Sequence, residues 1–256
     1  MKSQKKQPII ALAPIKYFDI SKRHNLEKIK NYIKRAKKAN ADIICFPESC
    51  VHKTETLAYN DDLIKEIQEE CKKNQIYCII TEDIIFNGKT FNTAILIGRD
   101  GGIKGKYKKI HLYGDEVIPG KNIYVFDTDF AKIGIVICWD LAFPELFRKM
   151  KELGAEIVFC PAQWCYEEKA YDKHHKEREI NILKSLVTAR AFENLYFVAL
   201  CNPLKDEKDL VSYSAIVSPS KILKETVDSE RLMTAKIDLT EIRRLENLYP
   251  LNISCN

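Results

Sequence analysis

The chain alternates between short apolar runs and longer stretches in which apolar residues recur every three or four positions. Short apolar runs are typical of strands buried in a sheet, and the wider spacing is typical of helices that pack on one face. This pattern predicts strands at residues 9–13, 42–46, 76–80, 91–97, 103–107, 133–137, 157–160, 196–200, 214–217, 222–226 and 233–237. It predicts helices at residues 21–38, 61–74, 144–153 and 172–193, and a short one near Glu241.

Polar residues and prolines mark the ends of several of these elements. Ser21 can cap the first helix, and Pro144 with Glu145 is typical of the first turn of another. Pro47 is expected to stop the strand at 42–46. The runs 91–97 and 103–107 flank Arg-Asp-Gly-Gly at 99–102 and therefore predict a hairpin.

Alternating strands and helices, joined in places by hairpins, predict an α/β fold with mixed sheets. The chain of 256 residues suits one large domain. No Pro-, Gly- or Ser-rich linker divides it, so we expect a single domain over residues 1–256, with a basic N-terminal tail at 1–8.

Composition excludes several classes of function. The chain is 46% hydrophobic and 30% charged, and its net charge of +5 is mild. Much of that charge lies at residues 1–7 and 28–38, which is typical of solvated surface, and no nucleic-acid-binding motif accompanies it. The N-terminus lacks a secretory apolar region, and no apolar stretch is long enough to span a membrane. We therefore expect neither nucleic acid nor membrane as a partner.

Nine cysteines are present, an odd number without a Cys-x-x-Cys pair. In a chain without a secretory signal this indicates reduced thiols and a cytoplasmic protein. The five histidines are scattered, so no metal site is expected.

Cys138 has two opposed interpretations. It follows the strand at 133–137 and precedes the helix that begins at Pro144. Free cysteines are most often inert core residues. A thiol between a strand end and a helix start is, however, also how α/β enzymes present a nucleophile, and the helix start would favour the thiolate.

Glu48 and Lys109 also follow predicted strands, and strand ends are where functional residues gather. A carboxylate can deprotonate a thiol, and an ammonium can stabilise the oxyanion of a tetrahedral intermediate. The alternatives are that Glu48 is only an ion-pair partner and that Lys109 belongs to a basic surface.

At this point the sequence resembles the nitrilase, or carbon–nitrogen hydrolase, superfamily, whose members use a Cys–Glu–Lys catalytic set. The resemblance covers nearly the whole chain. It is carried by Phe-Pro-Glu at 46–48, Phe-Asn-Thr-Ala at 91–94, Asp-Gly at 100–101, Tyr-Lys-Lys-Ile-His-Leu at 107–112, Ile-Cys-Trp-Asp at 137–140, Phe-Pro-Glu at 143–145 and Ala-Arg-Ala-Phe-Glu-Asn at 189–194, with Phe-Val-Ala at 197–199 and Asn202 following.

The resemblance implies roles for the site residues. Glu48 would be the general base, Cys138 the nucleophile and Lys109 the oxyanion-stabilising cation, joined by the backbone N–H of Trp139. Glu116 would position Lys109 and the substrate, with the adjacent residue 115 as a competitor and a solvated loop acid as the other interpretation.

Two further residues have smaller implied roles. Trp164 would form a pocket wall, although an aromatic residue there is more often core, and Glu145 would be structural.

The resemblance also implies a four-layer α-β-β-α sandwich that associates through helices into a homodimer or larger oligomer, without metal or organic cofactor. The implied activity is hydrolysis of a small linear amide or N-carbamoyl compound through a Cys thioester. Asp140 after Cys-Trp favours this over nitrile hydrolysis, because nitrilases usually have Glu there. A nitrilase, or a non-catalytic binding or regulatory member of the fold, stays open.

The chain departs from the family pattern in two places. Ser212 and Lys221 stand where the family commonly has glycine, so the local turn geometry is in question. The charged segment 165–180 is peculiar to this chain, and the resemblance assigns it no role.

Overall fold

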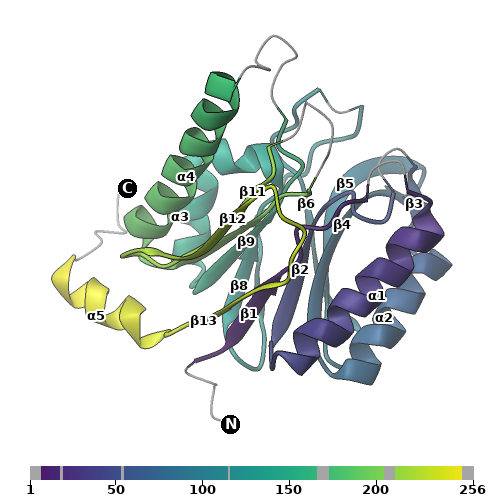
Figure 1. The fold of residues 1–256 in the computed structure, drawn as a ribbon, viewed down its shortest axis with the longest axis horizontal. Coiled ribbons are helices and arrows are strands. Elements are labelled where there is room, and N and C mark those ends of the chain that lie inside the picture. Colours follow the sequence, from purple (N-terminus) through teal and green to yellow (C-terminus); the bar gives the residue numbers. More distant parts are fainter. Residues whose placement is uncertain are drawn as a thin grey trace.

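The computed structural model describes residues 7–17, 20–52, 55–114, 116–165, 173–204 and 211–249, with side chains omitted for 173–175. Two mixed sheets face each other, as Figure 1 shows. The first sheet has the strand order β13-β1-β2-β4-β5-β6, with β3 beside β4. Its strands are β1 (Ile9–Leu12), β2 (Ile43–Glu48), β3 (Leu57–Ala58), β4 (Tyr77–Phe86), β5 (Lys89–Ile97), β6 (Ile103–Lys108) and β13 (Met233–Lys236).

The second sheet has the order β12-β11-β10-β9-β8-β7. Its strands are β7 (Val125–Asp127), β8 (Lys132–Ile135), β9 (Ile157–Pro161), β10 (Phe197–Cys201), β11 (Tyr213–Val217) and β12 (Ile222–Val227). β8, β9 and β10 are parallel, as are β1, β2 and β4 in the first sheet. The carboxyl ends of three central strands therefore lie at the same end of each sheet.

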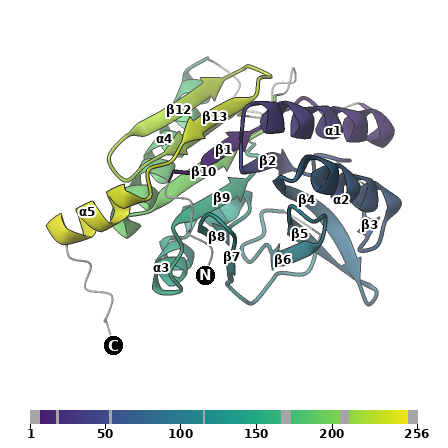
Figure 2. The same cartoon turned by 90° about the horizontal axis from the view of Figure 1, so that it is seen from below.

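Helices cover the outer face of each sheet (Figures 1 and 2). α1 (Lys22–Lys38) and α2 (Asp62–Asn74) lie on the first sheet, and α3 (Pro144–Glu152) and α4 (Lys173–Asn194) on the second, while α5 (Thr240–Leu248) follows β13. Ser21 and Asp61 cap α1 and α2 through their side-chain oxygens. The α/β fold with its α-β-β-α layering is confirmed.

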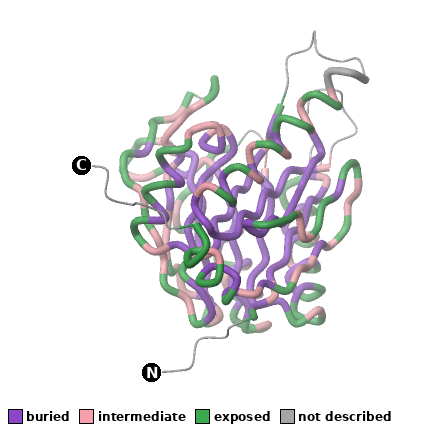
Figure 3. The backbone as a smooth tube through the Cα atoms, turned by 90° about the vertical axis from the view of Figure 1, so that its left-hand side faces the viewer, coloured by how far each residue is buried: buried purple, intermediate pink, exposed green. Residues whose placement is uncertain are grey.

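Two apolar clusters hold these layers together. One packs α1 and α2 against the outer face of the first sheet. The other lies between the sheets and continues to α3 and α4. Figure 3 shows the buried strands enclosed by elements with exposed faces. The strand ends that border the second cluster are consequently held in fixed positions.

The structure corrects several strand boundaries: β4 runs six residues past the predicted end at residue 80, and two further corrections lie near the site. β2 does not stop at Pro47 but continues to Glu48. Its pairing with β4 is irregular between Cys45 and Glu48, so a proline without an N–H donor is tolerated there. β8 ends at Ile135, so Cys138 begins a short 3₁₀ helix (Cys138–Ala142) that precedes α3. In the described part of the chain, no helix has the length and apolar character needed to cross a membrane.

Candidate active site

Glu48 and Lys109 form a buried ion pair at the carboxyl ends of the strands of the first sheet. Glu48 is the last residue of β2, and Lys109 follows β6. Their side chains are 6% and 3% exposed, and Lys109 Nζ lies 3.0 Å from Glu48 Oε1. The other carboxylate oxygen, Oε2, accepts a hydrogen bond from the backbone N–H of Gln163 at 3.0 Å. Both oxygens are thus held, as a positioned base requires.

Two residues from distant loops support this carboxylate. Tyr17 follows β1, is fully buried, and donates its hydroxyl hydrogen to the backbone carbonyl of Glu48. The side-chain amide of Gln163 donates to the Tyr17 hydroxyl at 3.1 Å. Burial raises the pKa of Tyr17, so it stays a neutral donor. Gln163 therefore links the end of the second sheet to Glu48 in the first sheet.

Cys138 stands opposite this pair at the end of the second sheet. Its backbone has a positive φ of 47°, a conformation that residues with a side chain adopt rarely. Such an outlier in a tight turn is a common way to present a nucleophile. The residue is 8% exposed, so its thiol borders the interior with limited access to solvent.

Three groups set the charge state of that thiol. Burial raises its pKa well above the ordinary value, and the neighbouring Glu48 carboxylate raises it further. Lys109 and the backbone N–H of Gln163 lower the pKa. Burial and Glu48 outweigh the helix start that we expected to favour the thiolate. The resting thiol is neutral beside a carboxylate, which is the arrangement in which a base takes the proton as attack begins.

Asp140 joins the cysteine turn to the lysine segment. It is fully buried. Its Oδ2 accepts from the Tyr107 hydroxyl at 2.7 Å and from the Ile137 backbone N–H at 3.1 Å. Its Oδ1 accepts from the His111 backbone N–H at 2.8 Å and lies 3.2 Å from Nδ1 of that ring. The carboxylate thereby fixes the main chain on either side of Cys138 and just beyond Lys109.

Aromatic rings pack around Trp139, the residue that follows Cys138. The Trp139 ring lies 5.4 Å from the Trp164 ring and 5.1 Å from the Tyr113 ring. Trp164 is 5% exposed, and its backbone N–H donates to the Asn202 side chain at 2.9 Å. Trp164 is thus placed beside Trp139, where the predicted pocket wall would lie.

The two acidic residues beyond the main set are exposed. Glu116 lies on the loop after Lys109 and Glu145 in the first turn of α3. Glu145 approaches Nε2 of His111 at 3.8 Å. The competing acid, Asp115, lies outside the described residues, as do positions 166–172 of the charged segment 165–180. The remainder of that segment begins α4.

The two departures from the family pattern leave the local backbone ordinary. Neither Ser212 nor Lys221 is among the residues with positive φ. The backbone carbonyl at each position accepts a hydrogen bond, Ser212 from the Asp228 N–H at 3.0 Å and Lys221 from the Ser218 N–H at 2.8 Å. Glycine is therefore not needed at either turn in this chain.

Sequence reasoning missed Tyr17, Gln163 and the bridging role of Asp140. Tyr17 and Gln163 sit in loops without periodicity, and only the fold brings them within hydrogen-bond distance. Asp140 carried a weak signal, since an acidic residue directly after an apolar strand and a cysteine is unusual. Among the described residues, no group of three or more His, Cys, Asp or Glu side chains could hold a metal ion.

Comparison with known proteins defines the class. Residues 9–247 match the carbon–nitrogen hydrolase family. The chain belongs to that family. Omega-amidase NIT2-A of Xenopus laevis is 27% identical over 257 residues, which cover 90% of this chain and 88% of the relative. The 2-oxoglutaramate amidase of Bacillus subtilis is 29% identical over 254 residues, or 91% and 93% of the two chains.

Solved structures show the same fold. The carbon-nitrogen hydrolase of Helicobacter pylori G27 superposes with a TM-score of 0.87 over 96% of this chain and 94% of its own, at 20% identity. Saccharomyces cerevisiae Nit3, of the nitrilase superfamily, gives 0.82 over 96% of each chain, at 23% identity. The resemblance stated from the motifs is therefore confirmed.

Proposed function

We propose that the protein hydrolyses the carbon–nitrogen bond of a small linear amide through a thioester on Cys138. The observation that carries this proposal is the juxtaposition of a buried Glu48–Lys109 ion pair with a cysteine of positive φ, the two coming from different sheets. A core cysteine needs neither the strained backbone nor the charged partners. The family supports the same reaction class.

The proposed steps balance protons at every stage. Glu48 takes the thiol proton while the sulfur of Cys138 attacks the amide carbonyl carbon. Lys109 and the backbone N–H of Trp139 bind the oxyanion that forms. The intermediate collapses, the carbon–nitrogen bond breaks, and Glu48 returns its proton to the departing ammonia or amine.

A water molecule then completes the cycle. Glu48 takes a proton from this water, whose oxygen attacks the thioester carbonyl. The carbon–sulfur bond breaks and the proton passes to the sulfur, which restores the thiol and releases the carboxylic acid. Glu116, on the loop after Lys109, is proposed to position the lysine and the substrate amide.

The amide class is favoured over the nitrile class. The omega-amidase and 2-oxoglutaramate amidase among the relatives act, by their names, on amides. Asp140 also satisfies its donors with a short side chain, and the longer Glu usual in nitrilases would not fit the same four contacts without movement. Ammonia release from short amides, ω-amides, N-carbamoyl amines and nitriles tests the order, and turnover of nitriles alone would reverse it.

Replacement of the nucleophile gives the sharpest test of the mechanism. Cys138→Ala should abolish ammonia release without changing the unfolding midpoint, whereas Cys165→Ala, at an exposed thiol, should leave both unchanged. With a reactive ester, wild-type protein should gain an acyl mass on the peptide that contains Cys138. Full activity of Cys138→Ala refutes the mechanism. A folded wild-type protein that is never acylated supports the alternative of a non-catalytic binding protein.

We also propose a homodimer formed through the helices on the second sheet. Several large apolar side chains are exposed there: Leu153, Ile182, Phe192, Leu248 and Tyr249. The Phe192 and Tyr249 rings already contact edge-to-face at 5.5 Å, which extends the apolar surface from α4 to the end of α5. Light scattering coupled to gel filtration should give twice the mass of 29.6 kDa, and Phe192→Asp should give the monomer.

The cysteines support the proposed cytoplasmic location. The structure describes eight of the nine cysteines, and seven of these eight are buried thiols. Reduced thiols of this kind persist in a reducing compartment. Thiol titration of protein purified without reductant, before and after denaturation, checks this point.

A further inference from the structure

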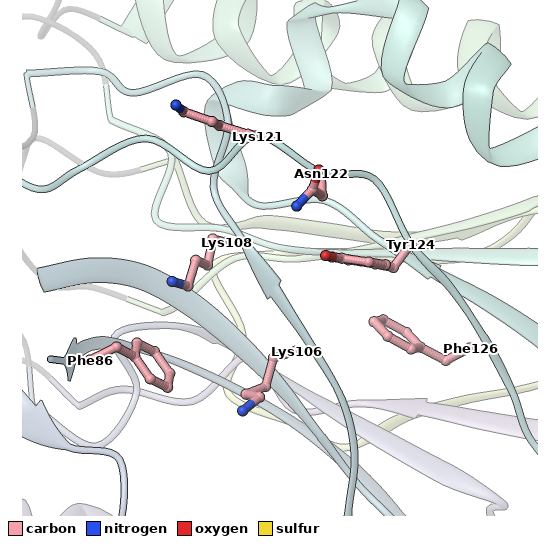
Figure 4. A pocket seen from close by; sticks show the side chains of 7 residues that line it. All are labelled: Phe86, Lys106, Lys108, Lys121, Asn122, Tyr124 and Phe126. Carbon is pink, nitrogen blue, oxygen red and sulfur yellow. The ribbon is translucent and has the colours of Figure 1, made fainter. Parts of the chain in front are cut away.

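A cavity lies away from the Cys138 site, between the edge strands of the two sheets. Its volume is about 440 Å³, and it is lined by Phe86, Lys106, Lys108, Lys121, Asn122, Tyr124 and Phe126. Figure 4 shows Lys106 and Lys108 extending from β6 beside Phe86, with the other residues forming the opposite wall. β6 and β7 are the edge strands here, and they touch where Phe126 covers Gly105.

Among the residues that the structure describes, the three lysines of this cavity have no acidic partner. In the part of the chain that the structure describes, no carboxylate forms an ion pair with any of them, and none lines the cavity. Two neighbouring lysines show the contrast, because Lys104 in β6 pairs with Asp100 at 2.6 Å and Lys109, just after β6, pairs with Glu48. Excess positive charge is therefore concentrated in this stretch of β6 and the loop before β7.

Aromatic faces hold two of these ammonium groups in place. Lys106 Nζ lies 4.1 Å from the centre of the Tyr59 ring and 5.3 Å from that of Phe86. Lys108 Nζ lies 4.7 Å from Phe86 and 3.3 Å from Phe91. Cation–π contacts order the side chains but leave their charge uncompensated by any anion. Burial and the neighbouring Lys106 lower the pKa of Lys108, as expected for like charges held together.

The size and walls of the cavity restrict what could neutralise this charge. A volume of about 440 Å³ lies in the usual range of roughly 300–1,000 Å³ for small-molecule sites. It is far larger than an inorganic anion needs. Tyr124 and Phe126 stack with ring centres 6.1 Å apart and supply an apolar wall opposite the lysines. A matching ligand has both a multivalent anionic group and an apolar, flat body.

We propose that this cavity binds a small aromatic phosphate ester, with the phosphate held by Lys106 and Lys108, Lys121 at the rim, and the ring against Tyr124 and Phe126. The site is distinct from the proposed active site, since Cys138, Glu48 and Lys109 do not line it. It is nevertheless close in the chain. Lys108 directly precedes Lys109, and the backbone N–H of Gly120, next to Lys121, donates to the carbonyl of Lys109 at 2.7 Å.

Calorimetry with three probes tests the proposal on the full-length protein. 1-Naphthyl phosphate carries the charge and the ring, inorganic phosphate carries only the charge, and 1-naphthol carries only the ring. We expect the ester to bind at least about tenfold more tightly than either of the others. Its affinity should fall as salt rises from about 20 to about 200 mM, because the phosphate contacts are partly exposed to solvent. Equal affinity for all three probes, or no binding of the ester, overturns the proposal.

Variants then locate the binding. Lys106→Gln, Lys108→Gln and Tyr124→Ala should each weaken binding of the ester by about tenfold. Lys37→Gln is the matched control, because it removes the same charge at the end of α1 and should leave the affinity unchanged. Unchanged affinity in all three cavity variants overturns the proposal.

A measurement on wild-type protein covers the case in which a variant fails to fold. The ester should protect Lys106 and Lys108 from acetylation, read peptide by peptide by mass spectrometry, and should leave Lys37 reactive. Equal labelling of all three lysines with and without the ester overturns the site. Since both experiments measure binding, their outcome is separate from that of the amidase proposal.

Discussion

Replacement of Asp140 by asparagine should disturb the nucleophile without touching it. Asn preserves the size of the side chain but turns one acceptor oxygen into a donor. Each carboxylate oxygen now faces one backbone N–H, which can only donate, and one side-chain group that can also accept: Ile137 with the Tyr107 hydroxyl on one side, and the His111 N–H with Nδ1 of that ring on the other. Whichever way the amide is oriented, at least one backbone donor loses its acceptor.

The size of the effect follows from burial. Asp140, Tyr107 and Ile137 are fully buried, so water does not replace the lost acceptor on that side. One unpaired buried donor costs about 1–3 kcal/mol, which is the expected loss in free energy of unfolding. If the amide oxygen stays on the buried side, the loss falls on the partly exposed His111, and the destabilisation lies near the lower limit. The protein remains folded at 25 °C if its stability is in the usual range of about 5–15 kcal/mol.

Activity should suffer more than folding. The Ile137 N–H and the His111 N–H fix the main chain beside Cys138 and after Lys109, and a displacement of about 1 Å in such a site can reduce the rate about 10²-fold. We expect kcat for amide hydrolysis to fall by about 10²-fold in Asp140→Asn at a temperature where the variant is folded.

Three measurements separate the consequences. Urea unfolding measures stability, steady-state ammonia release measures kcat, and the rate of iodoacetamide alkylation measures the reactivity of the Cys138 thiol. Asp127→Asn is the control, because that carboxylate is exposed and its nearest cation, Lys132, is 3.8 Å away. Wild-type stability together with wild-type kcat in Asp140→Asn would refute this account of the bridge.

Three further outcomes are expected. Lys109→Gln removes the cation that lowers the pKa of Cys138, so alkylation of that thiol near neutral pH should slow and kcat should fall about 10²–10³-fold; faster alkylation contradicts this. Tyr17→Phe keeps the ring but loses the donor to the backbone behind the base, and should cost about 1 kcal/mol in urea unfolding and reduce kcat; an unchanged kcat contradicts the positioning role. Burial raises the pKa of Glu82 from 4.5 to about 8, so the native state holds a proton that the unfolded state releases, and stability should fall as pH rises between these values. Glu82→Gln mimics the protonated form and should weaken the dependence of unfolding free energy on pH, measured between pH 4.5 and about 8. An unchanged pH dependence in this variant would mean that other groups cause it.

Most regular elements could be predicted from the sequence because their apolar spacing is strong. The cap at Ser21 and the start of α3 at Pro144 follow from local chemistry, and the structure shows both. β3 and β7 escaped notice, since two or three residues are too few to show a period. Continuation of β2 through Pro47 depends on irregular pairing with β4, which no local signal reveals.

Some features of the candidate site could likewise be predicted from the sequence, and others could not. Glu48, Lys109 and Cys138 could be predicted as a set because each follows a predicted strand within a recognisable motif. The resting charge of the thiol could not be found in this way, because it depends on burial and on a neighbour 90 positions away in the chain. Tyr17 and Gln163 act through contacts made only in the folded protein.

The links between the two sheets have a consequence for the order of folding. The hydrogen bond between Gln163 and Tyr17 joins positions 146 residues apart, and that between Gln163 and Glu48 joins positions 115 apart. Contacts that close such long loops tend to form late, after local helices and hairpins. During synthesis Glu48 and Lys109 emerge well before Cys138, the proposed nucleophile. Refolding should therefore restore the far-ultraviolet circular dichroism before it restores amide hydrolysis, and the enzyme gains its chemistry only when the last long loop closes.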